Sequence, residues 1–130
     1  PMIFCVIRKK MIVLTPEEWV RQHVVHWLLH CKNFPISLVN VEKVLLLHGI
    51  RKRYDIVVYN SDGSIMILVE CKAPEVVISQ AVFDQIARYN LSLNASYLMV
   101  TNGLQHFFCQ IDYKLSIYHF LPDLPSYALK

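Results

Sequence analysis

Apolar residues recur at helical spacing in the segment that follows Thr15, TPEEWVRQHVVHWLLHC. Thr15 stands at the N-cap, Pro16 opens the first turn and Glu18 follows three residues after the cap, a combination typical of a helix start with a capping box. One stripe of this helix is apolar, and it consists of Val20, Val24, Trp27, Leu28 and Cys31. The pattern therefore predicts a helix that packs one face on a core and stops within residues 32–35.

The pattern then changes to the spacing of β-strands. Three β-rich segments cover about residues 37–47, 53–59 and 64–72, with breaks at residues 48–49 and 60–63, of which the second is a hairpin signal. A second helix is expected from Ser79 to Leu93, then strands at residues 97–100 and 104–111 and an irregular tail with two prolines. The predicted order is αβββαβ plus one or two strands, an α/β fold with a mixed β-sheet flanked by helices.

Length and composition favour one soluble domain over residues 1–130. The chain has 55% hydrophobic residues and three glycines, enough for one core and few sites for a linker. Its apolar runs fall short of the roughly 18 residues of a membrane-spanning helix, so no membrane partner is expected. Apolar residues precede the basic cluster of the opening segment, unlike a secretory signal, and we expect a cytoplasmic protein.

The cysteines, histidines and charged residues limit the kinds of site and partner that the chain can have. Four dispersed cysteines without CxxC spacing predict reduced, mostly buried thiols. The spacing of His23, His26 and His30 could hold zinc, although partial burial or solvent exposure beside Trp19 and Trp27 fits it better. A formal charge of +3 permits a phosphate-rich partner without requiring one. The basic runs at residues 8–10 and 51–53 are typical of solvated faces.

The stretch ILVECKAP places Glu70 and Lys72 at the end of a predicted buried strand. If Asp62 and Gly63 are the two central residues of a tight hairpin, Asp55 lies directly opposite Glu70. Directly opposed residues share a face of the sheet, and Lys72, two residues beyond Glu70, shares it too. The register thus predicts that two carboxylates and one amine converge.

Opposed carboxylates need a positive partner, and the residues leave two alternatives open. One is a self-neutralising quartet in which Lys72, with Arg53 opposite it, balances both acids. The other is a hard divalent cation, Mg²⁺ or Mn²⁺, bound by carboxylate oxygens. A lysine beside such a metal serves hydrolysis, because it can take a proton from the attacking water or stabilise the charged phosphate.

The stretches RYDIVVY and ILVECKAP resemble the PD-(D/E)xK nuclease superfamily, with Asp55 as its isolated aspartate and Glu70, Cys71 and Lys72 as its ExK. Together with TPEEWVRQ, DQIARYN and the strand that ends in TNG, they are similar to the family of type I restriction enzyme R-subunit N-terminal domains. The resemblance implies a restriction-endonuclease-like core and a metal-dependent endonuclease that hydrolyses DNA phosphodiester bonds.

The resemblance also implies roles for individual residues. Asp55, Glu70 and the backbone carbonyl of Cys71 would bind one Mg²⁺ or Mn²⁺, and Lys72 would position or activate water. Gln85 and Tyr89 match a QxxxY motif, and their i,i+4 spacing places them on one helix face. The family implies that this face points toward the site.

Two glutamates compete for a further role in the site. Glu18 matches a first-helix glutamate that supplies an additional ligand in the family, yet the capping box uses the same side chain. Glu42 is an outside candidate for that ligand, and a cross-strand surface pair with Lys43 or a neighbour fits it better. Three basic residues are candidates for holding a nucleic-acid backbone, namely Arg51, Lys52 and Arg88.

Two further hypotheses remain open beside the nuclease. The first is a catalytically silent or partner-dependent nucleic-acid-binding module with the same fold, and the second is a structural domain with a neutralised charge cluster. The sequence contains no Gly-rich phosphate loop. Motor or specificity subunits are therefore possible partners alongside DNA, and the apolar segment IFCVI leaves a homodimer open.

Overall fold

The computed structural model describes residues 1–128 and contains a six-stranded sheet in the order β3-β4-β5-β6-β7-β8. Its strands are β3 (Val39–Leu47), β4 (Ile50–Tyr59), β5 (Ile65–Cys71), β6 (Tyr97–Thr101), β7 (His106–Asp112) and β8 (Ile117–Leu121). Helix α1 (Pro16–His30) precedes β3, and helix α2 (Gln80–Asn90) lies between β5 and β6. The predicted αβββαβ order is confirmed, followed by the additional strands β7 and β8. Strand β8 lies in the part of the chain that was predicted to be an irregular tail.

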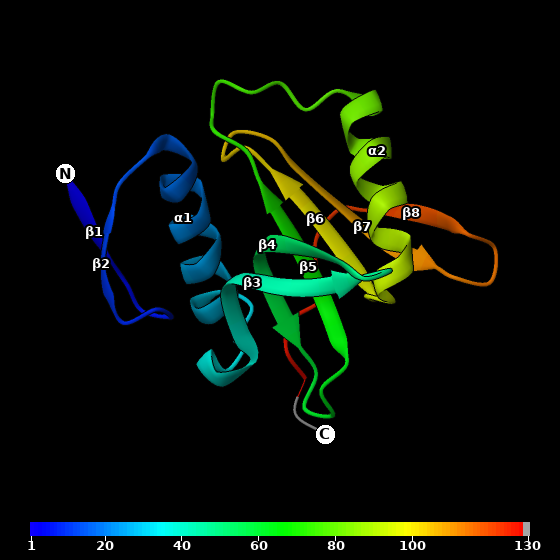
Figure 1. Ribbon diagram of the computed structural model, residues 1–130, viewed down its shortest axis with the longest axis horizontal. Helices are drawn as coiled ribbons and strands as arrows, with labels where there is room; N and C mark the ends of the chain where they lie inside the picture. Colours follow the sequence, from blue (N-terminus) through cyan, green and yellow to red (C-terminus); the bar gives the residue numbers. More distant parts are fainter. Residues whose placement is uncertain (129–130) are drawn as a thin grey trace.

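The helices cover opposite faces of the sheet (Figure 1). Helix α1 packs through Val24 and Leu28 on a core that includes Ile67 of β5, whereas α2 packs through Phe83 on a second core that includes Leu68. Consecutive residues of β5 thus face different helices, as the period of a strand requires. The central strands of the sheet are buried on both sides, which explains their nearly continuous apolar runs.

A short N-terminal hairpin lies outside α1, so that α1 stands between this hairpin and the sheet (Figure 1). It consists of β1 (Met2–Cys5) and β2 (Lys10–Val13), which pair with each other and with no strand of the main sheet. The sequence pattern did not predict this hairpin. Its strands are four residues each, and residues 6–9 between them contain no glycine that would signal a tight turn.

Strand direction determines where the ends of β5 and β6 lie. Every neighbouring pair in the main sheet is antiparallel except β5 and β6, which are parallel and joined through α2. Cys71, the last residue of β5, therefore pairs with Thr101, the last residue of β6. The segment after β5 begins beside the end of β6.

Both helix starts follow local sequence rules. The Thr15 hydroxyl accepts a hydrogen bond from the Glu18 N–H at 3.1 Å, which confirms the predicted N-cap. Ser79 caps α2 in the same way through the Val82 N–H at 3.2 Å. Helix α2 ends at Asn90, before the predicted Leu93, because Leu91–Leu93 form a 3-10 turn.

The predicted two-residue turn between β4 and β5 is wrong, because the loop has three residues, 61–63. Asn60 and Ser64 flank it, and the Asn60 N–H donates to the Ser64 carbonyl at 2.8 Å. The Gly63 φ of +89° provides the left-handed residue that a three-residue hairpin needs before its bulge.

A bulge between Val58 and Tyr59 compensates for the extra loop residue. Beyond it, Ile56 pairs with Val69, as the predicted register requires. The regular pairing of β4 with β5 ends at Ile56 and Val69, so the predicted register holds up to the residues next to Asp55 and Glu70. It is reached through a different turn and a one-residue correction.

Several smaller expectations can be compared with the described residues. Cys5, Cys71 and Cys109 are buried free thiols and Cys31 is an exposed one, which confirms the mostly buried thiols. The three histidines of α1 at positions 23, 26 and 30 are exposed. Within residues 1–128, no helix is long and apolar enough to cross a bilayer.

Candidate functional site

The regular alternation of side chains in β4 breaks at Asp55. Ile56 belongs to the core on the α1 side, yet Tyr54, two residues earlier, belongs to the core on the α2 side. Opposite Asp55 in β3, Glu42 has a φ of +54°, a left-handed conformation uncommon for residues other than glycine. The two strands pair on both sides of this point, at Val41 with Ile56 and at Lys43 with Tyr54.

This irregularity turns Asp55 toward α1. Its Oδ1 accepts a hydrogen bond from Arg21 Nη2 at 2.7 Å, and its Oδ2 accepts one from the Cys71 backbone N–H at 2.8 Å. The second bond links β4 to the last residue of β5. Asp55 and Glu70 therefore have different partners, in contrast to the shared face that the register predicts.

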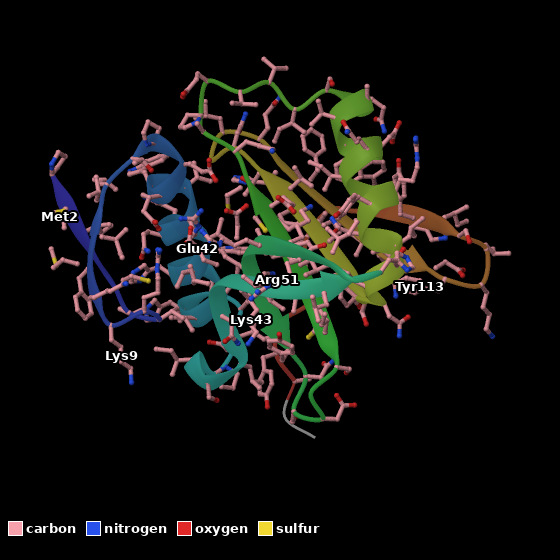
Figure 2. All side chains as sticks on the ribbon, viewed as in Figure 1. Met2, Lys9, Glu42, Lys43, Arg51 and Tyr113 are labelled. Atoms are coloured by element: carbon pink, nitrogen blue, oxygen red, sulfur yellow. The ribbon has the colours of Figure 1, made fainter. Side chains whose placement is uncertain are left out.

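Arg21 lies at the centre of an acidic cluster. Its guanidinium is within 4 Å of four carboxylates, those of Glu17 (3.5 Å), Glu18 (2.7 Å), Glu42 (3.7 Å) and Asp55 (2.7 Å). Figure 2 shows Glu42 beside α1. Burial disfavours the Arg21 charge, but the hydrogen bond to Asp55 and the neighbouring acids outweigh it and raise the pKa of Arg21.

A second arginine reaches the same cluster from the N-terminal hairpin. Arg8 Nη2 lies 2.7 Å from Glu18 Oε2, and Arg8 Nη1 lies 3.4 Å from Glu42 Oε2. Burial alone would raise the pKa of Glu18, but hydrogen bonds from Arg8 and Gln22 and the charge of Arg21 lower it. Glu18 thus offers only its backbone N–H to the helix cap, while its carboxylate belongs to this cluster.

Glu70 is buried on the side of α2. Its Oε1 accepts a hydrogen bond from Lys52 Nζ at 3.2 Å. The same ammonium lies 4.7 Å from the ring centre of Tyr54 and 4.2 Å from that of Tyr89, an arrangement that favours cation–π attraction. Burial raises the pKa of Glu70, while Lys52 opposes this rise and the charge of Asp55 adds to it.

Lys72 lies near Glu17, in the cluster around Arg21, and near Glu70. Its backbone N–H donates to the Thr101 carbonyl at 2.8 Å, which fixes the start of the segment after β5. No side-chain hydrogen bond or ion pair holds its ammonium within the described chain. Its charge acts to lower the pKa of both Glu17 and Glu70, so Lys72 is the available amine beside the carboxylates.

The other residues that the sequence assigned to the site differ in their contacts and exposure. Tyr89 reaches Glu70 through Lys52, whereas Gln85 is exposed and has no side-chain hydrogen bond within residues 1–128. Arg51 and Arg88 are exposed, which leaves their role in nucleic-acid binding a prediction. Lys52, assigned by sequence to the nucleic-acid backbone, instead contacts Glu70 in this structure.

The charge quartet predicted from the sequence is wrong, because other cations pair with its two acids. Arg53 is exposed and pairs with Val44 of β3, and the cations that meet Asp55 and Glu70 are Arg21 and Lys52. Sequence reasoning missed Arg21, although its i,i+3 and i,i+4 spacing from Glu18 and Glu17 predicts ion pairs along one helix face. No local signal connects Arg21 to Asp55, because 34 residues separate them.

The donors of the cluster suit a hard divalent cation chemically, since carboxylate and peptide oxygens are its preferred ligands. Their present contacts do not leave them free for one. Arg21 and the Cys71 N–H occupy both oxygens of Asp55. Within residues 1–128, no three His, Cys, Asp or Glu side chains are arranged to hold a metal together.

The αβββαβ core and its mixed sheet are consistent with the restriction-endonuclease-like class of α/β domains. Residues 16–125 match the family described as Type I restriction enzyme R protein N terminus (HSDR_N). This match covers most of the chain, and the chain therefore belongs to that family.

A solved structure is similar in fold. It is a fragment assigned to the HsdR subunit of a type I restriction enzyme from Vibrio vulnificus YJ016. The two share 20% sequence identity, with a TM-score of 0.57 over 87% of this chain and 24% of the other. This chain thus spans about a quarter of that protein's length, and the likeness concerns the fold. No curated protein matches the sequence.

Proposed function

We propose that this chain is a nuclease domain of the PD-(D/E)xK superfamily that hydrolyses DNA phosphodiester bonds with Mg²⁺ or Mn²⁺. The observation that carries the proposal is the meeting of Asp55 with the end of β5, where Glu70 is buried and Lys72 has a free ammonium. Membership of a restriction-enzyme R-protein family supports a role in DNA cleavage. Motor and specificity subunits are the partners that such a domain would need for complete restriction.

In this proposal, Asp55, Glu70 and the Cys71 carbonyl would hold the metal, which would supply Lewis-acid charge stabilisation and acidify a water molecule. Arg21 and Lys52 must then give up part of their contacts with the two carboxylates. Lys72 would hold or accept the proton of the attacking water. Tyr89 would act indirectly, by restricting where Lys52 can move when Glu70 binds the metal.

A second candidate is a nucleic-acid-binding module that is silent or dependent on a partner. It is favoured by the ion pairs that already neutralise Asp55 and Glu70. If these pairs persist at millimolar Mg²⁺, no metal binds and no cleavage follows, and the structural domain with a neutralised charge cluster is supported instead. Cleavage by the metal-bound chain therefore distinguishes the nuclease from the silent or partner-dependent module.

The first experiment titrates Mn²⁺ and Mg²⁺ while the melting temperature and the integrity of supercoiled plasmid are recorded. For the nuclease, the metal raises the melting temperature, because it binds the folded chain, and nicks the plasmid. Asp55→Ala and Lys72→Ala should each lower nicking by at least about a hundredfold, the usual scale of general acid–base groups.

Lys114→Ala is the matched control, because Lys114 is exposed in the turn between β7 and β8. This variant should nick plasmid like the unmodified protein. Circular dichroism must show that both site variants keep their fold. Unchanged nicking in either folded site variant would rule out the nuclease assignment, and metal binding without nicking would support the silent or partner-dependent module.

A further inference from the structure

A groove lies between α1 and the strands β6 and β7, on the face of the sheet opposite α2. It encloses about 450 Å³, within the range of small-molecule sites. Its walls are mainly aromatic, formed on the α1 side by Trp19, His23 and Trp27 and on the sheet side by Met99, His106 and Phe108. We call it the aromatic groove.

Three rings of the aromatic groove lie in nearly parallel planes. The Trp27 and Phe108 ring centres are 5.9 Å apart with an interplanar angle of 24°, and those of His106 and Phe108 are 6.4 Å apart at 23°. Aromatic faces in this arrangement attract further flat rings by offset stacking. The geometry suits a planar, unsaturated ligand better than a branched aliphatic one.

Two histidines provide polar atoms at fixed positions in these walls. The His23 Nδ1 lies 2.8 Å from the Trp19 carbonyl, which can only accept, so Nδ1 carries the hydrogen and Nε2 is an acceptor. The His106 Nδ1 lies 2.6 Å from the Thr101 hydroxyl. Neither Nε2 has a hydrogen-bond partner within residues 1–128. Each ring is thus oriented by the protein and keeps one nitrogen for a ligand.

The charge of the groove excludes a phosphate as the group it binds. Asp123 borders the groove, and its carboxylate is paired with Lys32 at 2.5 Å. The walls therefore present no unpaired cation to an anion, while the two histidine nitrogens can bond the polar edge of a neutral ring. A nucleobase combines a flat aromatic face with such an edge.

Thr101 connects the aromatic groove to the candidate nuclease site. Its carbonyl accepts the Lys72 N–H, and its hydroxyl contacts His106 and accepts the Gly103 N–H at 3.0 Å. Gly103 lines the groove and lies so close to α1 that a Cβ there would be 3.2 Å from the Trp19 ring. The groove therefore begins beside the strand end that presents Lys72.

We infer that the aromatic groove binds an unpaired nucleobase of a nucleic-acid strand whose backbone passes Lys72, stacked against its Trp, Phe and His rings. This inference rests on the proposed nuclease function for the identity of the ligand. Base stacking on aromatic side chains tolerates any sequence, so the groove selects unpaired over paired strands and not one base over another.

The test uses the intrinsic fluorescence of the unmodified chain, because its only two tryptophans, Trp19 and Trp27, both line the groove. A single-stranded 12-mer of mixed sequence is titrated in EDTA, beside an abasic strand of equal length and the corresponding duplex. The intact strand should quench the fluorescence to saturation. The abasic strand and the duplex should bind at least about tenfold more weakly, as expected when one or two stacked bases are missing.

Two variants test the groove itself, His106→Ala, at an exposed position, and Phe108→Leu, at a partly buried one. Each should weaken binding of the intact strand about fivefold to tenfold, as removal of one stacking ring does. Phe120→Leu is the matched control, since Phe120 is half exposed on β8 and packs on Phe83 of the α2 side. It should bind the strand like the unmodified chain.

The outcomes separate this inference from the nuclease proposal. The inference is overturned if the intact strand leaves the fluorescence unchanged, if the abasic strand binds equally well, or if His106→Ala binds like Phe120→Leu. Plasmid nicking without fluorescence quenching would contradict only the inference about the groove. Fluorescence quenching without nicking, if Asp55→Ala is quenched equally, would support the groove and contradict only the proposed cleavage activity.

Discussion

Single buried charges determine how the acidic cluster is held together. Arg21 touches four carboxylates and is itself buried, and Glu18 is bonded by two arginines and one glutamine. A buried charge that loses its partner typically costs about 3–5 kcal/mol. Arg21 and Glu18 are therefore expected to matter for stability even where they take no part in a reaction.

Glu18→Gln should lower the free energy of unfolding at pH 7 by about 3 kcal/mol, because Arg8 and Arg21 lose their shared anion. The folded state lowers the pKa of Glu18 below its ordinary value of 4.5. The native chain thus binds this proton less tightly than the unfolded chain, and the contribution of Glu18 is full above that value. It is lost as the pH falls through the lowered pKa.

Urea denaturation between about pH 3 and pH 7 measures this difference, which should shrink below pH 4.5. The exposed residue Glu75 lies outside the ion-pair network of the described chain, so Glu75→Gln should change the free energy of unfolding by less than about 0.5 kcal/mol. A Glu18→Gln deficit that stays constant down to the lowest pH would contradict this account.

The sequence singled out the two acids and the amine as candidates, but not their partners in the structure. Asp55, Glu70 and Lys72 could be found because their strands are marked by period and turn signals. Arg21 reaches Asp55 from helix α1. Lys52 reaches Glu70 from strand β4, beyond the irregularity at Asp55. Side-chain pairs of this kind depend on packing between distant segments, for which local patterns carry no information.

Two backbone irregularities position the site elements. The bulge after Val58 restores the predicted register at Ile56 and Val69, next to Asp55 and Glu70, and the left-handed Glu42 accompanies the change of face at Asp55. The strand pattern predicted this register without either feature. Bulges and left-handed residues are set by how a twisted sheet fits its neighbours, and they are common beside functional sites.

Contact between the turn after β6 and α1 provides a test at the level of elements. Gly103 has a φ of +87°, and a Cβ there would meet Trp19 and Val20 at 3.2 Å. Gly103→Ala should therefore lower the free energy of unfolding by about 2–3 kcal/mol, the sum of backbone strain and overpacking. The measurement is urea denaturation at neutral pH.

Gly63→Ala is the matched control for backbone strain alone. Gly63 has a φ of +89°, and a Cβ there would meet nothing within 4 Å. Its cost should be about 1 kcal/mol, the penalty of a left-handed residue other than glycine. Equal losses of stability in the two variants would show that the turn does not press on α1.

The arrangement of charge over the whole molecule bears on how DNA would approach. The chain carries a formal charge of +3. Arg51, labelled in Figure 2, and Arg53 are exposed on the β3–β4 hairpin, and together with Val44 they line a shallow cleft. Both lie on the strand that carries Asp55. This hairpin is the basic surface nearest to the candidate site along the chain.

The double variant Arg51→Gln and Arg53→Gln should weaken binding of a duplex in EDTA and reduce the slope of log K against log salt by about 2, about 1 for each cation removed from the phosphate backbone. Fluorescence anisotropy at several salt concentrations measures this slope. Lys114→Gln removes a charge from the exposed β7–β8 turn instead and should leave the slope unchanged. An unaltered slope in the double variant would exclude this hairpin from the DNA interface.

The sequence alone determined the helix start at Thr15, the order of the elements and the pairing of β4 with β5, and it proposed the candidate catalytic residues. These follow from capping, from strand period and from turn residues, which act between near neighbours in the chain. Only the tertiary structure decided that Arg21 meets Asp55, that Arg8 enters the cluster from an outer hairpin, and that two tryptophans open onto a groove. Those contacts join segments far apart in sequence, and only the packing of α1 between hairpin and sheet brings them together.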